Sequence, residues 1–315
     1  MPKFAFIFPG QGSQAIGMMA AHANGHPQVK SRFDVAAQVL GFDLWALVAD
    51  GPLEELNRTQ NTQPALLAAS VACWDIWRDS GGSAPTLMAG HSFGEYSALV
   101  CAGSLAFEEA VELVAARGRL MQEAVPVGVG AMAAVLGLAL ESLREACMEA
   151  AAGEVVECAN LNAPGQIVIS GHAGAVARAS ALASQRGAKK IIPLAVSTPI
   201  HCALMQPAAQ RFEPLIGAAE VRTPNIPVIH NVDVETHSDP EMIRRALLAQ
   251  FSRPVRWQET IEKFSSSGIT RALECGPGKI LGPLVRRCIP TIGVGSLGTP
   301  EELTTNLLSL NEAGP

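Results

Sequence analysis

The sequence has few aromatic residues, few charged residues and no long apolar run. Aromatic side chains make up 5% of the 315 residues, with a single tyrosine, and charged side chains make up 17%. Hydrophobic residues nevertheless reach 48%, which excludes a disordered chain and predicts a sizeable core. Glycine and alanine are common in the sequence and aromatic residues are scarce, so we expect helices that pack closely against a sheet.

A basic excess and a metal-binding cysteine pattern are both missing. The formal net charge is −6, whereas nucleic-acid-binding proteins usually carry a basic excess, so we expect no nucleic-acid partner. The seven cysteines are scattered, and no two of them have CxxC spacing. This pattern favours reduced thiols over a disulfide framework or a zinc site.

Segments that would direct the chain to a membrane are not apparent either. The N-terminal stretch MPKFAFIFPG has one lysine, and its apolar run of five residues ends at Pro9-Gly10. This run is too short for a signal peptide, and no other stretch approaches the length of a transmembrane span. We therefore expect a cytoplasmic protein without membrane contact. We also expect a monomer.

Short apolar runs alternate with helical patterns over much of the chain. FAFIF (4–8) and TLMAG (86–90) have the length and continuity of buried strands, and we expect another strand over 225–232. Apolar spacing typical of helices covers 28–49, 63–79, 93–103 and 107–124. This alternation predicts an α/β fold with a mainly parallel sheet.

Residues 127–197 follow a different order. Strand patterns in AMAAVLG, VVECANL, QIVISG and KKIIPLAV are interrupted by helical patterns in LESLREACMEAA and AVARASALASQRG. The resulting order β-α-β-β-α-β is the ferredoxin-like pattern. We therefore expect 127–197 to form a small subdomain, inserted into a large domain built from 1–126 and 198–315.

Residues 90–94 read GHSFG and fit the pattern G-x-S-x-G. In hydrolases with this pattern the serine lies on a tight turn between a strand and a helix, with its hydroxyl exposed. The expected strand before Gly90 and the expected helix after Gly94 match that context. Ser92 is therefore a candidate nucleophile. The alternative is a structural turn flanked by glycines.

A serine hydroxyl needs a base to act as a nucleophile, and the residues alone leave the choice of base open. His91 is adjacent to Ser92, but adjacent side chains on such a turn point apart. His172 follows a strand, and His201 follows another strand close to the start of a helix. The remaining histidines, several of them in polar loop-like stretches, are His22, His26, His230 and His237.

Seven motifs in one order carry a resemblance to a known family. They are FPGQGSQ (8–14), TQPAL (62–66), GHSFGEYSAL (90–99), ARGRLMQEA (116–124), HCALMQPAA (201–209), VRWQETI (255–261) and ECGPGKIL (274–281). With these motifs the chain resembles the malonyl-coenzyme A:acyl carrier protein transacylases of fatty acid synthesis over nearly its whole length. The resemblance implies an α/β-hydrolase-like large domain with a ferredoxin-like small domain.

The resemblance also implies roles for individual residues. Ser92 would be the acylated nucleophile and His201 its base, oriented by the backbone carbonyl of Gln250. The oxyanion hole would be made by the backbone N–H groups of Gln11 and Phe93. Such a donor typically lowers the barrier by about 3 kcal/mol.

Arg117 is implied as the group that binds the free carboxylate of malonate. A guanidinium offers two parallel N–H donors to a carboxylate, and a buried cation without its partner would disfavour acetyl groups. Gln11 and His91 are expected to contact the substrate as well. The family often has leucine at the position of Phe93 and serine at that of Ile200, so both side chains are expected to reshape the acyl pocket. Methylmalonyl is therefore a second possible acyl group.

The implied reaction transfers malonyl from malonyl-CoA to the phosphopantetheine thiol of holo acyl carrier protein, with no metal and no bound cofactor. Because the carrier protein is acidic, we expect a local basic patch on the enzyme. The candidates are Arg186, Lys189 and Lys190 in one group and Lys279, Arg286 and Arg287 in another. Alternatives are a serine thioesterase, a trans-acting acyltransferase of polyketide synthesis, and an inactive scaffold.

Overall fold

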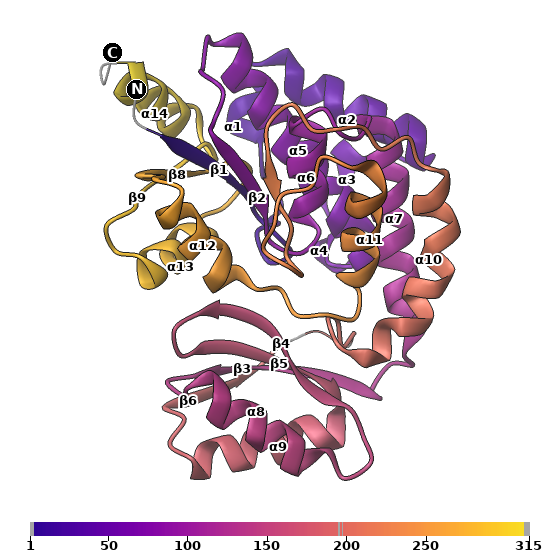
Figure 1. Cartoon of the computed structure of the whole chain (residues 1–315). Helices are drawn as coiled ribbons and strands as arrows, with labels where there is room; N and C mark the ends of the chain where they lie inside the picture. Colours follow the sequence, from indigo (N-terminus) through magenta and orange to yellow (C-terminus); the bar gives the residue numbers. More distant parts are fainter. Residues whose placement is uncertain (1–2, 195, 197, 312–315) are drawn as a thin grey trace.

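The computed structural model describes residues 3–194, 196 and 198–311 and contains a large and a small domain, each with its own sheet (Figure 1). The five strands of the large domain are all parallel and lie in the order β7-β2-β1-β8-β9. Their bounds are β1 (Phe4–Phe8), β2 (Leu87–Gly90), β7 (Val228–Ile229), β8 (Arg271–Glu274) and β9 (Gly293–Ser296). The expected parallel α/β fold is confirmed.

Helices cover both faces of this sheet. On one side lie α2 (Pro27–Leu40), α5 (Thr59–Asp79), α6 (Gly94–Cys101) and α7 (Phe107–Ala124), and on the other lie α12 (Trp257–Ser266) and α13 (Leu281–Cys288) (Figure 1). The remaining helices of this domain are α1 (Ala20–Ala23), α3 (Leu44–Asp50), α4 (Leu53–Leu56), α10 (Gln206–Ala218), α11 (Pro240–Ala249) and α14 (Pro300–Asn311), with a 3₁₀ turn over Ala203–Met205.

The strand β1 shows why its sequence is a continuous apolar run. Phe4, Phe6 and Phe8 point into the core cluster beneath α5 and α6, whereas Ala5 and Ile7 point into the cluster beneath α12 and α13. Successive side chains of a strand alternate between the two faces of a sheet. A central strand covered on both sides therefore has no position for a polar residue.

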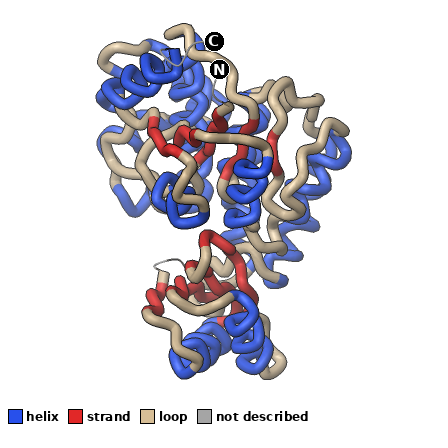
Figure 2. Tube along the Cα trace, turned by 60° about the vertical axis from the view of Figure 1, so that its left-hand side comes forward, coloured by secondary structure: helices blue, strands red, loops and turns tan. Residues whose placement is uncertain are grey.

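The small domain has the expected ferredoxin-like order, β3 (Gly130–Leu136), α8 (Leu140–Ala151), β4 (Val156–Ala163), β5 (Gln166–His172), α9 (Ala173–Gln185) and β6 (Lys190–Pro193). Its antiparallel sheet has the strand order β4-β5-β3-β6. Figures 1 and 2 show α8 and α9 on the face of this sheet that points away from the large domain. The other face is left to line the space between the domains.

Three expectations from the sequence need correction or lie outside the description. The helix expected over 28–49 is two helices, α2 and α3, because Gly41 ends α2 with a left-handed φ of 76°. The strand expected over 225–232 is reduced to Val228–Ile229. The boundary expected at 197 falls on a residue outside the described ones.

The strand β4 ties the small domain to the large one. Leu161 donates its N–H to the carbonyl of Val255 at 2.9 Å, and the N–H of Val255 donates to the carbonyl of Ala159 at 2.9 Å. Val255 thus lies beside β4 like a short parallel strand. Of the helices in the described part of the chain, none combines the length and the apolarity needed to cross a membrane.

Candidate active site

Ser92 lies on the turn between β2 and α6, at the carboxyl end of the parallel sheet. Its φ of 54° is in the left-handed region, which non-glycine residues rarely adopt and which is typical of strained functional turns. The two glycines make the turn possible. A Cβ on Gly90 would lie 1.9 Å from the backbone carbon of Gly94, and a Cβ on Gly94 would lie 2.4 Å from the carbonyl oxygen of Phe8.

His201 lies next to the serine hydroxyl although 109 positions separate the two residues. Its Nε2 is 2.7 Å from Ser92 Oγ, and its Nδ1 is 2.7 Å from the backbone carbonyl of Gln250. Because a carbonyl only accepts, Nδ1 must carry the proton, which leaves Nε2 free to accept the proton of the serine. The three residues thus have the arrangement of a nucleophile, a base and an orienting group.

The buried position of His201 keeps its imidazole neutral. Burial and then the positive charge of Arg117 lower the pKa of His201 from 6.5 to about 3. The side chain is fully buried, so the charged form loses its hydration. A neutral imidazole is the form that can act as a general base.

The two backbone N–H groups expected in the oxyanion hole lie on neighbouring loops. Gln11 follows β1 and Phe93 follows β2, and these strands are paired with Phe8 opposite Gly90. A Cβ on Gly10 would lie 2.7 Å from the carbonyl oxygen of His91, so the two loops are in contact. Neither N–H donates to the backbone of another described residue, and both are therefore available to an oxyanion.

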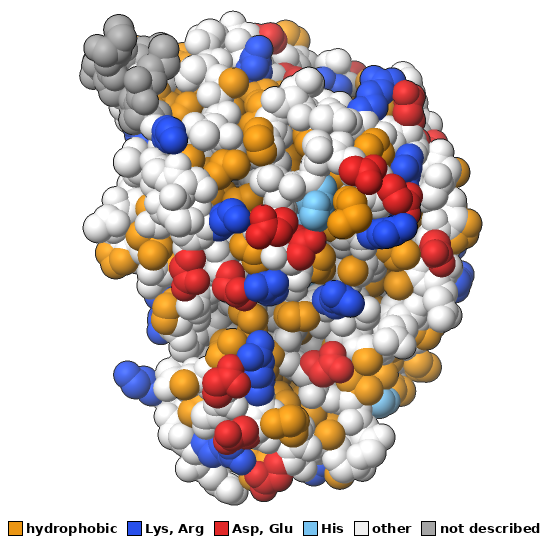
Figure 3. All heavy atoms as spheres, viewed as in Figure 1, with side chains coloured by type: hydrophobic (Ala, Val, Ile, Leu, Met, Phe, Trp, Pro, Cys, Tyr) orange, Lys and Arg blue, Asp and Glu red, His pale blue; other side chains and the backbone are white. Residues whose placement is uncertain are grey.

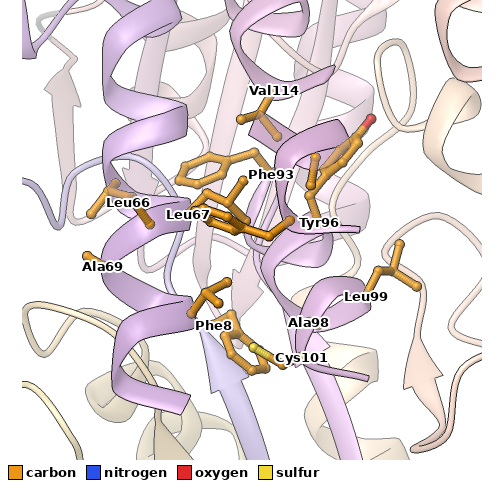
Figure 4. Packing of buried hydrophobic residues seen from close by; sticks show 14 of the residues in the cluster. Phe8, Leu66, Leu67, Ala69, Phe93, Tyr96, Ala98, Leu99, Cys101 and Val114 are labelled. Carbon is orange, nitrogen blue, oxygen red and sulfur yellow. The ribbon is translucent and has the colours of Figure 1, made fainter. Parts of the chain in front are cut away.

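The side chain of Phe93 does not line the cleft between the domains, so its expected effect on the acyl pocket stays a prediction. Phe93 is buried in the core of the large domain, where Leu67, Tyr96 and Val114 surround it (Figure 4). Ile200, the other departure from the family pattern, does line the cleft beside the dyad.

Arg117 places a buried positive charge beside the nucleophile. Its guanidinium lies 3.3 Å from Ser92 Oγ and donates to the side-chain oxygens of Gln63 at 3.0 Å and Gln250 at 2.7 Å. The side chain is 1% exposed. No acidic side chain in the described part of the chain lies within ion-pair distance, and Nε has no partner there. A buried cation without an anion is a built site for one.

Three further residues hold this arrangement, and none of them is predicted from the sequence as a site residue. Asn231 accepts the N–H of Ser92 at 2.7 Å and donates to the carbonyl of Gly90 at 2.7 Å, so it holds both ends of the turn. Glu95 accepts from the side chains of His230 and Gln250. Gln63 binds Arg117. The only sequence signal for Gln63 and Glu95 is that they lie within the motifs TQPAL and GHSFGEYSAL. The sequence contains no signal for Asn231.

A cleft of about 590 Å³ between the two domains is lined by His91 and Ile200, the residues that directly precede Ser92 and His201 in the chain. His91 lies on its wall, its Nε2 donates to the side-chain oxygen of Asn162 of β4 at 2.8 Å, and its ring packs against Trp257. Its pKa is lowered by burial. Other lining residues come from both domains and include Gln11, Gln122, Met132, Asn160, Gln166, Val168, Thr198, Ile280 and Leu284. The volume of the cleft is in the usual range for ligand pockets, and its lining contains both polar and apolar side chains. It can therefore hold an extended, partly polar ligand.

The basic residues expected to bind the carrier protein differ in their surroundings. Arg186 pairs with Glu145 and Glu149, and Lys279 pairs with Glu302, so these two are already neutralised. The others, which we call the cleft-edge basic group, are exposed and have no acidic partner in the described part of the chain: Lys189, Lys190, Arg286 and Arg287.

The cleft-edge basic group has members in both domains, and two of them lie near the β4–β5 hairpin. Arg287 donates to the carbonyl of Pro164 at the tip of the β4–β5 hairpin, at 3.2 Å. The carbonyl of Gly165 accepts from Gly137, whose Cα faces the side chain of Lys189. On the face seen in Figure 3, Lys and Arg side chains are interspersed with Asp and Glu.

A strained serine on a strand-to-helix turn, with a neutral histidine beside it and two backbone donors nearby, has the arrangement of a serine enzyme with a nucleophile and a base. The comparisons narrow this class. Residues 5–281 match the model of the acyl transferase domain family. The malonyl CoA-acyl carrier protein transacylase of Escherichia coli (strain K12) is 50% identical, with 98% of this chain and 99% of that protein covered. The chain belongs to this family of acyltransferases.

Other relatives extend the same comparison. The malonyl CoA-acyl carrier protein transacylase of Bacillus subtilis (strain 168) is 44% identical, over 99% of this chain and 98% of that protein. The solved structure of the transacylase from Coxiella burnetii superposes with a TM-score of 0.97 at 50% identity, covering 98% of each chain. A malonyl-transacylase solved with a type II polyketide acyl-carrier protein has a TM-score of 0.96 at 51% identity, covering 98% of this chain and 99% of that one.

Proposed function

We propose that this enzyme transfers the malonyl group from malonyl-CoA to the phosphopantetheine thiol of holo acyl carrier protein through a malonyl-Ser92 intermediate. The observation that carries the proposal is Arg117, a buried guanidinium 3.3 Å from the nucleophile that lacks an acidic partner among the described residues. Malonyl supplies a carboxylate at the distance of one methylene from the reacting carbonyl. A bidentate guanidinium–carboxylate pair would then hold this carbonyl over Ser92.

The chain's own groups account for each proton in the first half-reaction. Ser92 Oγ attacks the thioester carbonyl while its proton moves to Nε2 of His201. The N–H groups of Gln11 and Phe93 stabilise the negative oxygen of the tetrahedral intermediate. When the carbon–sulfur bond breaks, His201 returns the proton to the leaving thiolate of coenzyme A, and malonyl stays on Ser92.

The second half-reaction runs through the same groups. The phosphopantetheine thiol gives its proton to His201 and attacks the malonyl ester. The carbon–oxygen bond to Ser92 then breaks, and His201 returns the proton to the serine. The backbone carbonyl of Gln250, 2.7 Å from Nδ1 of His201, orients the imidazole and fixes its tautomer, as the acidic third member does in a triad.

Intact-protein mass spectrometry tests this proposal. We expect a malonyl adduct within seconds of mixing with malonyl-CoA, no adduct on Ser92→Ala, and loss of the adduct when holo acyl carrier protein is added. Acetyl-CoA is the control for the role of the carboxylate. Release of free malonate without an acceptor would identify a thioesterase instead, and the lack of both adduct and free malonate would identify an inactive scaffold.

A carrier protein of polyketide synthesis is the second candidate acceptor. It is favoured by the similarity to a malonyl-transacylase that was solved in complex with a type II polyketide acyl-carrier protein. The chemistry is identical, so only the acceptor differs. Transfer rates to the two kinds of holo carrier protein, measured with the same malonyl-enzyme, would distinguish fatty acid from polyketide synthesis.

We also propose that the carrier protein docks on the cleft-edge basic group, because these four side chains are free to pair with acidic residues of a partner. For the enzyme itself we propose a cytoplasmic monomer that needs neither a metal nor a bound cofactor. Dialysis against a chelator should therefore leave the rate of malonyl-adduct formation unchanged. A rate that falls and returns on addition of a divalent cation would contradict this.

A further inference from the structure

The side chain of Gln250 lies between two buried groups of opposite charge. On one side its Oε1 accepts from the guanidinium of Arg117 at 2.7 Å, and on the other side its Nε2 donates to the carboxylate of Glu95 at 2.8 Å. Arg117 and Glu95 are each 1% exposed, and Gln250 is fully buried. The two charges thus share one neutral amide and make no direct ion pair.

The orientation of this amide follows from its neighbours. The carboxylate of Glu95 and the carbonyl of Ser92 can only accept, and both face Nε2, the second at 3.1 Å. The guanidinium can only donate, and it faces Oε1. A reversed amide would place like polar groups against each other on both sides. The amide therefore fits between Arg117 and Glu95 in one orientation only.

Without this amide, Arg117 and Glu95 would be expected to pair. Glu95 would keep His230 and the N–H of Asn231 as partners, but opposite charges attract far more strongly in a buried site than in water. Both side chains would also have lost a hydrogen-bond partner, which is costly for a buried charged group. The carboxylate of Glu95 would then occupy the donors of Arg117 that an incoming carboxylate needs.

We propose that the Gln250 side chain is a positioning residue for substrate selection: it separates Glu95 from Arg117 and so keeps the guanidinium free for the carboxylate of the acyl group. This inference rests on the proposed malonyl transfer. It is separate from the backbone carbonyl of Gln250, which orients His201 and is retained in every substitution of the side chain. Gln250 thus serves the base through its main chain and the specificity of the site through its side chain.

Substitution of Gln250 and Glu95, singly and together, tests whether the Gln250 side chain keeps Glu95 away from Arg117. Gln250→Ala should slow malonyl-adduct formation roughly 10- to 100-fold, since Arg117 and Glu95, both buried and charged, each lose a hydrogen bond to the amide. Labelling of Ser92 by a neutral fluorophosphonate should change much less, because the dyad is intact. The double variant Gln250→Ala/Glu95→Gln should recover at least about fivefold over Gln250→Ala, since the competing carboxylate is gone.

Glu95→Gln is a conservative change in this surrounding. His230 can move its proton to the buried Nε2, which has no partner in the described part of the chain, and can then accept from the new amide. The single variant Glu95→Gln should not accelerate malonyl-adduct formation, because Gln250 already separates the charges. The benefit of removing the carboxylate should appear only when the separating amide is absent.

Gln63→Ala is the matched control. It also removes an amide that accepts from Arg117, at 3.0 Å, but Glu95 does not lie behind that amide. The slower malonyl-adduct formation in Gln63→Ala should therefore not be restored when Glu95→Gln is added. Gln250→Ser gives a second shortened variant with a polar side chain, so the comparison does not depend on the stability of Gln250→Ala.

Two results would overturn the proposal. One is a shortened Gln250 variant that forms the malonyl adduct as fast as the unchanged enzyme. The other is a loss that Glu95→Gln leaves unrelieved while fluorophosphonate labelling stays intact. The unchanged enzyme is measured in the same series, and its failure to form an adduct would instead contradict the proposed malonyl transfer.

Discussion

At the scale of single residues, the charge of Arg117 should be visible in the pH dependence of the nucleophile. Burial, and then Arg117, lower the pKa of His201 to about 3. We therefore expect fluorophosphonate labelling of Ser92 to stay constant from pH 8 down to about pH 5, because His201 remains unprotonated there. In Arg117→Gln the positive charge is gone, protonation of His201 becomes easier, and the rate should begin to fall at a higher pH.

Gln63→Ala is the control for this experiment, since it alters the surroundings of Arg117 and keeps its charge. Superimposable pH profiles for the unchanged enzyme and Arg117→Gln would contradict the electrostatic account.

The lowered pKa of His201 also has a consequence for the stability of the fold. The unfolded chain binds a proton at His201 near its ordinary pKa of 6.5, so the free energy of unfolding should fall as the pH is lowered from there toward about 3.

Gly90 is a residue whose replacement should affect the whole domain. A Cβ at this position would lie 1.9 Å from the backbone of Gly94, and backbone atoms on both sides of the turn are held by Asn231 and by the sheet. We expect Gly90→Ala to lower the free energy of unfolding by about 3 kcal/mol or more, measured by urea denaturation.

The matched substitution is Gly217→Ala near the end of α10, where a Cβ would meet no atom within 4 Å. Alanine is the better helix former, so this change should be neutral or stabilising by up to about 1 kcal/mol. Equal midpoints for the two variants would show that the turn relaxes more easily than its packing indicates.

At the scale of elements, local patterns predicted most of the fold. The small domain alternates short strands with two clear amphipathic helices, and its order was predictable because each element has its own periodicity. The break between α2 and α3 was missed because apolar spacing continues through Gly41, and backbone conformation decides the boundary. The strand over 225–232 shrank to Val228–Ile229 because the following residues bind Glu95 and Ser92 instead of a neighbouring strand.

The candidate site was predictable to a different extent. Ser92 has a local signature, since glycines flank it between a strand and a helix. His201 has none, because its partner lies 109 positions away and only the fold brings the two together. Asn231 and the separation of Arg117 from Glu95 depend on contacts between three distant segments. Such contacts leave no periodicity in the sequence.

Basic residues of α13 should affect transfer to the carrier protein and leave acylation of the enzyme unchanged. Its Arg286 and Arg287 are exposed and unpaired among the described residues, and they belong to the cleft-edge basic group. Replacing both with glutamate should raise the apparent KM for holo carrier protein roughly tenfold or more at low salt, because complementarity mainly speeds encounter. Acylation by malonyl-CoA should be nearly unchanged. Steady-state transfer and single-turnover acylation measure the two halves separately.

Arg222→Glu is the control for charge reversal as such. This residue follows α10 and is paired with Glu220, and it does not belong to the cleft-edge basic group. Its replacement should leave the KM for carrier protein within about twofold. Equal losses in both half-reactions for the Arg286 and Arg287 variant would place these residues in the acylation step and remove the case for docking there.

At the scale of the whole molecule, the cleft exists because two domains with separate sheets are held at a fixed separation. The backbone hydrogen bonds between β4 and Val255 and the bond between His91 and Asn162 cross the junction. The small domain is thus a wall of the site and is continuous with the large domain along β4. Such ties favour a cleft of constant shape over a mobile lid.

This junction predicts one cooperative unfolding transition. All four tryptophans, Trp45, Trp74, Trp77 and Trp257, belong to the large domain, so tryptophan fluorescence reports on that domain, whereas far-UV circular dichroism reports on both. Because β4 shares hydrogen bonds and packing with the large domain, loss of either domain exposes the other. We expect the two signals to give the same midpoint in urea. An early loss of circular dichroism at constant fluorescence would mean that the small domain unfolds by itself, and the wall of the cleft would then be free to move.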